Sequence, residues 1–192
     1  MRSDKTIARD SRDKALRKCF AALAEGDPSA IATAYDLAAD NLFGYLVCLL
    51  RSRADAEDAL QEVFLDVARH YRRFGRARRP WLYLLRATKN TASKVIKARA
   101  RRSRMSAPEE LRLLEARGAP AVNGCTGEIS AALSKLPEGQ REVVVLKIWQ
   151  GLTFREIARV TGTTANTAAS RYRYALEKLA RHLSRNKKEE SR

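Results

Sequence analysis

The sequence predicts an all-α protein made of two small helical domains joined by a flexible linker. Apolar residues recur at the helical period of about 3.6 residues over most of the chain. No segment of any length alternates with the two-residue period of a strand. A stretch past the middle is rich in glycine and proline and lacks the apolar density of a core element. The 192 residues are enough for one or two domains with cores of their own.

Four helices are expected before this stretch, and glycine and proline mark where they meet. The first helix stops near Gly26, where Gly26-Asp27-Pro28 supplies a break, a capping side chain and a proline suited to the first helical position. Pro80 opens the last of the four. Cys19 and Cys48 fall on apolar helix faces and are expected to be core thiols. The expected helices cover residues 11–25, 28–50, 55–72 and 81–102.

Four further helices are expected after the linker, over 129–135, 138–150, 153–160 and 165–184. Composition then divides the chain into an N-terminal extension with one amphipathic helix (1–27), a first domain (28–104), a linker (105–128), a second domain (129–185) and a disordered tail (186–192).

The last two expected helices are joined by a tight turn. Gly162 follows Ala158 by four residues, where glycine adopts a left-handed backbone without a Cβ clash, and Thr164 can cap the next helix. A longer, more basic second helix is typical of a helix-turn-helix, in which that helix enters the DNA major groove. An ordinary helical hairpin with a solvated polar face is the alternative. The inward face of the second helix is expected to carry Ala168, Tyr172, Ala175, Leu176, Leu179 and Leu183.

The charge of the chain favours a polyanionic partner. Lys and Arg number 38 against 22 Asp and Glu, which gives a formal net charge of +16. Nucleic acid is the expected partner, and an anionic membrane surface competes with it. No apolar run reaches the length of about 18 residues that a membrane span needs, and the N-terminus lacks the apolar centre of a secretory signal. Three widely spaced cysteines suit a reducing compartment, so a cytoplasmic location is expected.

No pattern of catalytic residues stands out. We find no nucleophile–base pair, no metal-ligand constellation and no glycine loop that would cradle a phosphate. The expectation is therefore a binding protein with no catalytic residues, metal, cofactor or small-molecule substrate.

Two blocks of opposite charge are expected to contact different partners. Residues 54–66 contain five acids and no Lys or Arg, whereas residues 69–104 contain 14 Lys or Arg and no acid. The basic block suits a phosphate backbone, and its interleaved aromatic residues suit stacking on unpaired bases. The acidic helix suits a basic protein surface better than DNA; a plain solvated helix is its alternative. For Trp81 alone, core packing and base stacking remain equally open.

The order of these features resembles the bacterial sigma factors, specifically the small two-domain extracytoplasmic-function group. DAEDALQEVFLDV is similar to the family's region 2.2, and FGRARRPWLYLLRATKN to its region 2.3 running into 2.4. LSKLPEGQREVVVLKIWQGLTFREIARVTGTTANTAASRYRYALEKL is similar to regions 4.1 and 4.2. The resemblance covers about 28–104 and 129–183.

The resemblance implies a dissociable RNA polymerase subunit that recognises the −10 and −35 promoter elements and promotes DNA melting. One face of the acidic helix would grip the clamp helices of the β′ subunit, through Asp58, Gln61, Glu62 and Leu65. The first domain would open the −10 element through Tyr71, Arg72, Arg76, Arg78, Arg79, Trp81, Tyr83, Lys89, Lys94 and Lys97. The second domain would sit on the β flap and read the −35 element through Arg155, Thr164, Asn166, Thr167, Ser170, Arg171 and Arg173. An anti-sigma factor is a further implied partner.

Two other functions compete with this interpretation. A free-standing helix-turn-helix regulator would leave the acidic helix and the aromatic basic block without a role. A nucleic-acid-processing enzyme would need carboxylates or histidines clustered between domains, and the sequence offers only His70 and His182.

Overall fold

The computed structural model of the chain is helical throughout the residues that it describes, 2–103 and 127–190, with side chains over 10–102 and 131–184. The predicted all-α fold is confirmed. Residues 105–126 of the expected linker, including Cys125, lie outside the described residues. The described helices are α1 (Arg2–Ala24), α2 (Ala30–Leu50), α3 (Arg53–Gly75), α4 (Pro80–Ser103), α6 (Gly127–Ser134), α7 (Glu138–Ile148), α8 (Phe154–Thr161) and α9 (Ala165–Glu190).

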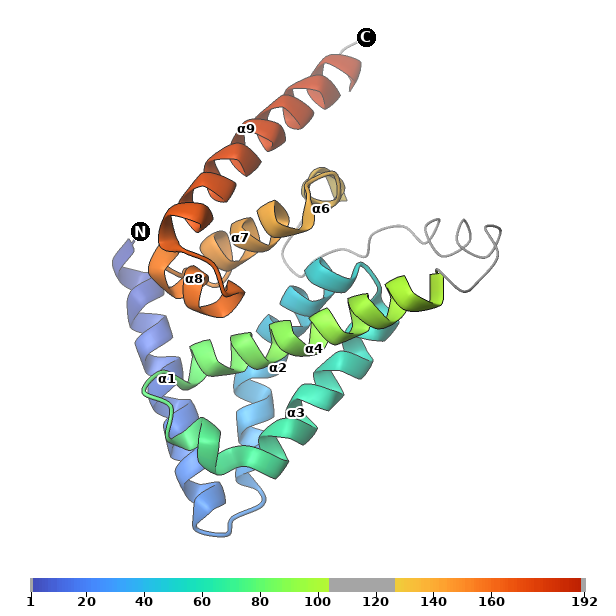
Figure 1. Cartoon of the computed structure of the whole chain (residues 1–192). Helices are drawn as coiled ribbons and strands as arrows, with labels where there is room; N and C mark the ends of the chain where they lie inside the picture. Colours follow the sequence, from blue (N-terminus) through green and yellow to red (C-terminus); the bar gives the residue numbers. More distant parts are fainter. Residues whose placement is uncertain (1, 104–126, 191–192) are drawn as a thin grey trace.

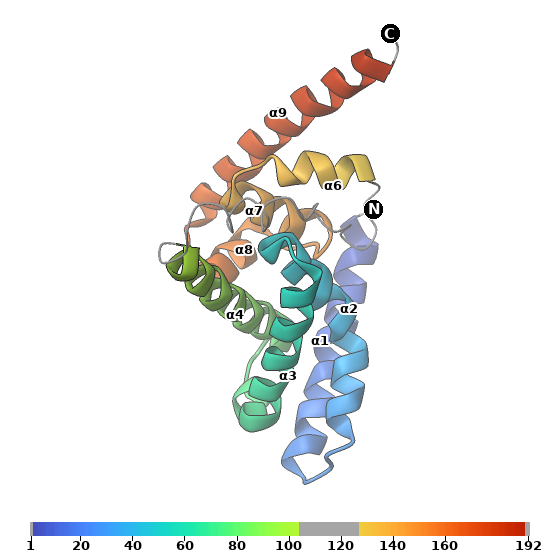
Figure 2. The same ribbon diagram turned by 90° about the vertical axis from the view of Figure 1, so that its right-hand side faces the viewer.

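The helices form two groups that lie against each other. Helices α1 to α4 pack together as one group, and α6 to α9 form the other (Figure 1, Figure 2). The groups meet where α7 packs on α2 and α8 packs on α4. Buried side chains of both groups, including Trp81, Tyr45 and Leu146, belong to one connected core. Cys19 and Cys48 are buried in the core of the first group, as predicted.

Local chemistry sets several of the helix ends. The Ser52 hydroxyl accepts a hydrogen bond from the Asp55 N–H (3.3 Å) at the start of α3. Thr153 and Glu156 form a reciprocal capping box at the start of α8. Gly162 ends α8 at φ +70°, the predicted left-handed turn. The Thr164 hydroxyl accepts from the Thr167 N–H (3.1 Å) at the start of α9, as predicted.

Two helices are longer than the sequence pattern indicates. Helix α1 begins at Arg2, and α9 continues to Glu190, into the segment expected to be disordered. Lysine and glutamate are good helix formers, so the end of α9 stays helical without apolar residues to anchor it. The end of α9 extends past the other helices (Figure 1). Leu176 and Leu183, expected to point inward, are exposed, although Ala175 is buried and Leu179 packs against the core.

Candidate nucleic-acid and protein interfaces

The acidic face of α3 consists of Asp58, Gln61, Glu62 and Leu65, and it points into solvent. The four positions lie at i, i+3, i+4 and i+7 and therefore share one side of the helix. Leu65 is 49% exposed although it is aliphatic. No ion pair joins Asp58 or Glu62 to another residue of the described ranges. The opposite side of α3 is buried through Ala59, Val63 and Val67. The acidic face is thus held on a rigid helix and left without a partner.

A kink in α3 separates the acidic face from the basic segment. His70 has non-helical angles (φ −127°, ψ 26°), and its Nδ1 lies 3.0 Å from Asp66 Oδ1. The chain beyond it turns toward α4. We define the basic segment as residues 71–83. Its exposed members are Arg72, Arg73, Arg76 and Arg78, and its half-buried rings are Tyr71 and Tyr83. Farther along α4, Lys94 and Lys97 are exposed and Lys89 is half-buried.

Trp81 packs as a core residue. Its side chain is 0% exposed, and the Arg12 guanidinium covers the ring at 4.5 Å from the centroid. Of the two roles left open by the sequence, this placement favours core packing, because a ring sealed by α1 has no face available for a base. Tyr83, which packs edge-on against Phe74 (4.8 Å between centroids), keeps part of its surface accessible.

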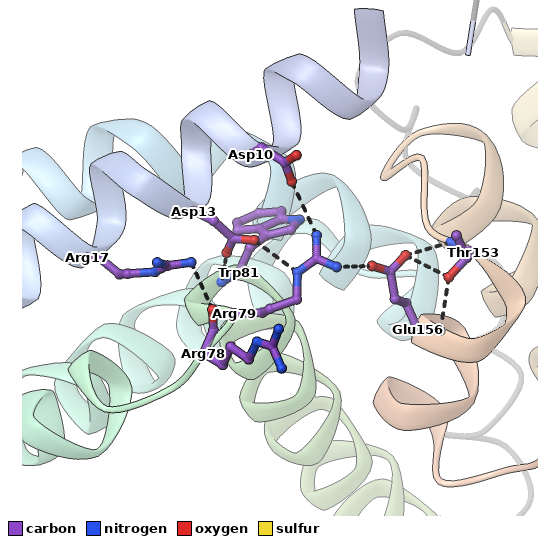
Figure 3. Close-up of polar contacts among 8 residues, drawn as sticks. All are labelled: Asp10, Asp13, Arg17, Arg78, Arg79, Trp81, Thr153 and Glu156. Atoms are coloured by element: carbon purple, nitrogen blue, oxygen red, sulfur yellow. Dashed lines mark hydrogen bonds and ion pairs between the residues drawn. The ribbon is translucent and has the colours of Figure 1, made fainter. Parts of the chain in front are cut away.

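Arg79 joins three elements that are distant in sequence (Figure 3). Its Nε lies 3.3 Å from Asp13 Oδ2, and its Nη2 lies 3.4 Å from Asp10 Oδ1, both on α1. Its Nη1 donates to Glu156 Oε1 on α8 at 2.6 Å. The other Glu156 oxygen serves the capping box, accepting from the Thr153 N–H (2.8 Å). Arg79 therefore links the start of α4 to the helix-turn-helix.

A buried polar cluster forms a second link between the groups. The Tyr45 hydroxyl donates to Glu142 Oε1 at 2.7 Å, and Lys89 Nζ lies 3.7 Å from the same oxygen. Nearby, the Gln150 side-chain amide donates to the Asn41 carbonyl oxygen (3.3 Å). Hydrogen-bonded partners of this kind are what a buried carboxylate requires.

The helix-turn-helix presents a short α8 and a longer α9 joined at Gly162. Ile157 and Val160 of α8 and Ala168 and Ala175 of α9 are buried, and Phe154 packs against Tyr172 (5.7 Å between centroids). The expected DNA-contacting residues differ in exposure: Arg155, Thr164, Asn166 and Arg173 are exposed, whereas Thr167, Ser170 and Arg171 are half-buried. The Arg171 guanidinium packs against Gly139 of α7, so closely that a Cβ at residue 139 would lie 3.2 Å from Arg171 Nη1.

Family models and curated relatives match the same two groups of helices. ECF RNA polymerase sigma factor BldN of Streptomyces coelicolor is 27% identical over 183 residues, 92% of this chain and 69% of the relative. SigK of Mycobacterium tuberculosis is 28% identical over 165 residues, 80% of this chain and 85% of the relative. RpoE of Cereibacter sphaeroides is 39% identical over 56 residues, and this match spans only 29% of this chain and 31% of the relative. The Sigma-70 region 2 model matches residues 35–102, and the Sigma-70, region 4 model matches residues 126–179. The chain belongs to the extracytoplasmic-function sigma factors.

Solved structures share the fold of this sigma factor. The sigma factor RpoE in complex with the anti-sigma factor NepR from Bartonella quintana superposes with a TM-score of 0.68 at 20% identity, over 81% of this chain and 98% of that one. CnrH in complex with the cytosolic domain of CnrY superposes with a TM-score of 0.64 at 22% identity, over 88% of this chain and 97% of that one. In the described ranges of this sigma factor, no helix has the length and apolarity to cross a membrane.

Three residues that organise these interfaces were missed by the sequence analysis. Asp13 shares the inward face of α1 with Leu16 and Phe20, and a carboxylate among apolar residues is a signal that could have been noticed. Glu142 stands next to the apolar run Val143–Leu146, which carries the same signal. The spacing of Thr153 and Glu156 is a signal for a capping box, but nothing in the sequence near Glu156 indicates its contact with Arg79.

The pKa of Glu142 makes the packing of the two groups depend on pH. Burial raises the pKa of Glu142 above its usual 4.5, and Glu138 acts in the same direction, whereas Tyr45, Lys89 and Arg171 lower it. Because the packed form favours the protonated acid, packing strengthens as the pH falls through this pKa and weakens as the pH rises. We expect energy transfer between dyes on the two groups to rise as the pH is lowered from neutrality toward the usual carboxyl pKa of 4.5.

The matched control for this expectation is Glu142→Gln, a neutral side chain of the same shape. The variant should lose most of the pH dependence while remaining helical by circular dichroism. A wild-type response of the opposite sign, or the same response in the Gln variant, would show that another group controls the packing.

Proposed function

We propose that this sigma factor binds core RNA polymerase in the cytoplasm, recognises the −10 and −35 promoter elements and promotes DNA melting. The observation that carries the proposal is the change of charge along the chain, from the acidic face of α3 to the basic segment that follows it. The unpaired acidic face suits a basic protein surface, and beyond the kink at His70 the exposed arginines suit a nucleic acid. Two partners of opposite charge can thus be engaged side by side.

The basic segment supplies what strand separation needs. The exposed guanidinium groups of Arg72, Arg76 and Arg78 can contact phosphates, and the half-buried rings of Tyr71 and Tyr83 can stack on an unpaired base. Extruding a base costs a few kcal/mol, which such contacts must offset. Lys89, Lys94 and Lys97 extend the positive charge along α4. Trp81 supports this surface from within the core.

The helix-turn-helix is the proposed reader of the −35 element. The first turn of α9 presents Thr164 and Asn166 to solvent, with Ser170 and Arg173 one to two turns further along. Arg155 at the start of α8 is placed to contact a phosphate.

Replacing Arg171 with alanine tests base readout by α9. If Arg171 leaves its position on α7 and contacts a base edge, the variant holoenzyme should bind the preferred −35 sequence about 1–3 kcal/mol less tightly and should discriminate less between sequences. Binding titrations against the preferred and a scrambled −35 duplex measure both effects, with Arg181→Ala, an exposed arginine farther along α9, as the matched control. Equal losses on both duplexes would identify a phosphate contact instead.

The two groups of helices must separate during initiation. The −10 and −35 elements are centred about 25 base pairs apart, which corresponds to about 85 Å of duplex at roughly 3.4 Å per base pair. In the packed arrangement, however, Arg79 and Lys89 of the first group touch Glu156 and Glu142 of the second. We propose that core polymerase draws the groups apart. The complexes of RpoE with NepR and of CnrH with CnrY support an anti-sigma factor as a further partner.

Binding to purified core polymerase, compared with binding to duplex DNA alone, tests the proposed function. We expect a tight, saturable complex with core polymerase and weak, salt-sensitive binding to duplex DNA in its absence. Specific binding to duplex DNA without any affinity for core polymerase would contradict the proposal and favour a free-standing regulator.

A further inference from the structure

Helix α1 lies entirely outside the region 2 match, which begins at residue 35, yet it contacts the segment that joins α3 to α4. Asp10, Asp13 and Arg17 lie at i, i+3 and i+7, on one side of the helix. Asp10 and Asp13 reach the Arg79 side chain, and Arg17 Nη2 donates to the Arg78 carbonyl oxygen at 2.9 Å (Figure 3). One face of α1 therefore contacts two consecutive residues of the basic segment, Arg78 and Arg79.

Asp13 makes the most demanding of these contacts. Its Oδ1 accepts the Trp81 N–H at 2.8 Å, while its Oδ2 faces Arg79 Nε at 3.3 Å. The Trp81 N–H belongs to the first turn of α4, where no carbonyl of the same helix is available as an acceptor. Asp13 thus caps α4 from another helix. It is only 3% exposed, so both of its contacts are shielded from water.

Arg78 and Arg79 are neighbours with different surroundings. The Arg79 side chain is 30% exposed and faces the three carboxylates of Asp10, Asp13 and Glu156. Two of these carboxylates are on α1 and would remain when the helix-turn-helix moves away. Arg78 is exposed, and no described acidic side chain is within ion-pair distance of it. Of the two guanidinium groups, only that of Arg78 is available to a phosphate.

We propose that Asp13 is a positioning residue for strand opening, and that Arg79 acts through Asp13 rather than as a phosphate ligand. The proposal rests on the proposed function of residues 71–83. Asp13 sets the start of α4 and the direction of Arg79, and this in turn sets the directions of Arg78 and Tyr83 toward the DNA.

The test compares Asp13→Asn with Asp10→Asn in the full chain bound to core polymerase. Asparagine can still accept the Trp81 N–H but loses the charge that holds Arg79. We expect Asp13→Asn to reduce open-complex formation about tenfold, measured by permanganate reactivity of −10 thymines, with polymerase affinity unchanged. Asp10→Asn, at an exposed and longer contact, should stay within about twofold.

The salt dependence of promoter binding separates positioning from phosphate contact. Arg78→Ala should lower the slope of log affinity against log salt by about one, whereas Arg79→Gln and Asp13→Asn should leave it unchanged. Arg79→Gln also guards against a folding defect in the buried variant, since Arg79 is partly exposed. Asp13→Asn and Arg79→Gln combined should reduce opening no more than either alone.

A lower salt slope in Arg79→Gln, additive effects of the two substitutions, or normal opening by Asp13→Asn would each overturn the proposal. Failure of the proposed function would look different, because the wild-type chain itself would then open no promoter.

Discussion

Reversing the charge of Asp58 and Glu62 to lysine is expected to weaken binding to core polymerase about thousandfold, roughly 4 kcal/mol. Both carboxylates are exposed on the acidic face of α3 and have no partner in the described residues. Lysines there would meet a surface complementary to acids, and like charges brought together at an interface cost several kcal/mol. Fluorescence anisotropy of the labelled chain titrated with core polymerase measures the effect.

The matched control reverses two other exposed acids, Glu25 and Glu177, which lie away from the acidic face. This variant gains the same net charge and should bind core polymerase nearly as tightly as the wild type. Both variants should retain their helical spectrum, because exposed positions contribute little to stability. Equal affinity of the two variants for core polymerase would remove the acidic face from the interface.

Replacing Trp81 with alanine is expected to lower the free energy of unfolding by about 3–5 kcal/mol. The ring is fully buried in the core beneath Arg12, so its removal leaves a cavity that the surrounding helices cannot fill. Trp81→Phe should cost much less, because it keeps a ring and removes an indole N–H that has no hydrogen-bond partner in the structure. Urea unfolding followed by circular dichroism gives both values.

Tyr83→Ala is the contrasting variant, since Tyr83 is only half-buried. It should lose less stability than Trp81→Ala and should reduce opening of the −10 element if its ring stacks on a base. A Trp81→Ala protein of wild-type stability that fails to open promoters would reverse the two assignments.

The helices and their ends could be predicted because their causes are local. The period of apolar residues places α2, α3 and α4, and single residues such as Pro80, Thr164 and Gly162 mark ends that the structure confirms. The predicted end of α9 at residue 184 differs from the structure, in which the helix continues to Glu190. The reason is again local, because a tail rich in lysine and glutamate is compatible with either a polar helix or a disordered segment.

The contacts between elements could not be predicted in this way. Tyr45 and Glu142 are 97 residues apart, and Arg79 and Glu156 are 77 apart, so no local pattern links them. An aromatic residue that follows a proline at a helix start can face either the core or a ligand, and only the position of α1 decides for Trp81. The charges of the acidic face and of the basic segment can be read from the sequence, whereas the exposure of each of these side chains depends on packing.

These contacts give the packed arrangement a physical meaning. Glu156 holds Arg79 and Glu142 holds Lys89, so two cations of the first group are occupied by acids of the second. On the proposed function, separating the groups frees Lys89 for DNA, while α1 continues to hold Arg79. Separation also exposes the carboxylates of Glu142 and Glu156 to water.

Promoter-dependent transcription by core polymerase, with and without this chain, tests the central claim most directly. Run-off synthesis over a pool of random promoter sequences should begin only when the chain is added, and the active templates should share two elements at a fixed spacing. If no template in the pool yields more transcript with the chain than with core polymerase alone, the assignment of the acidic face to polymerase and of the basic segment and α9 to the promoter is wrong.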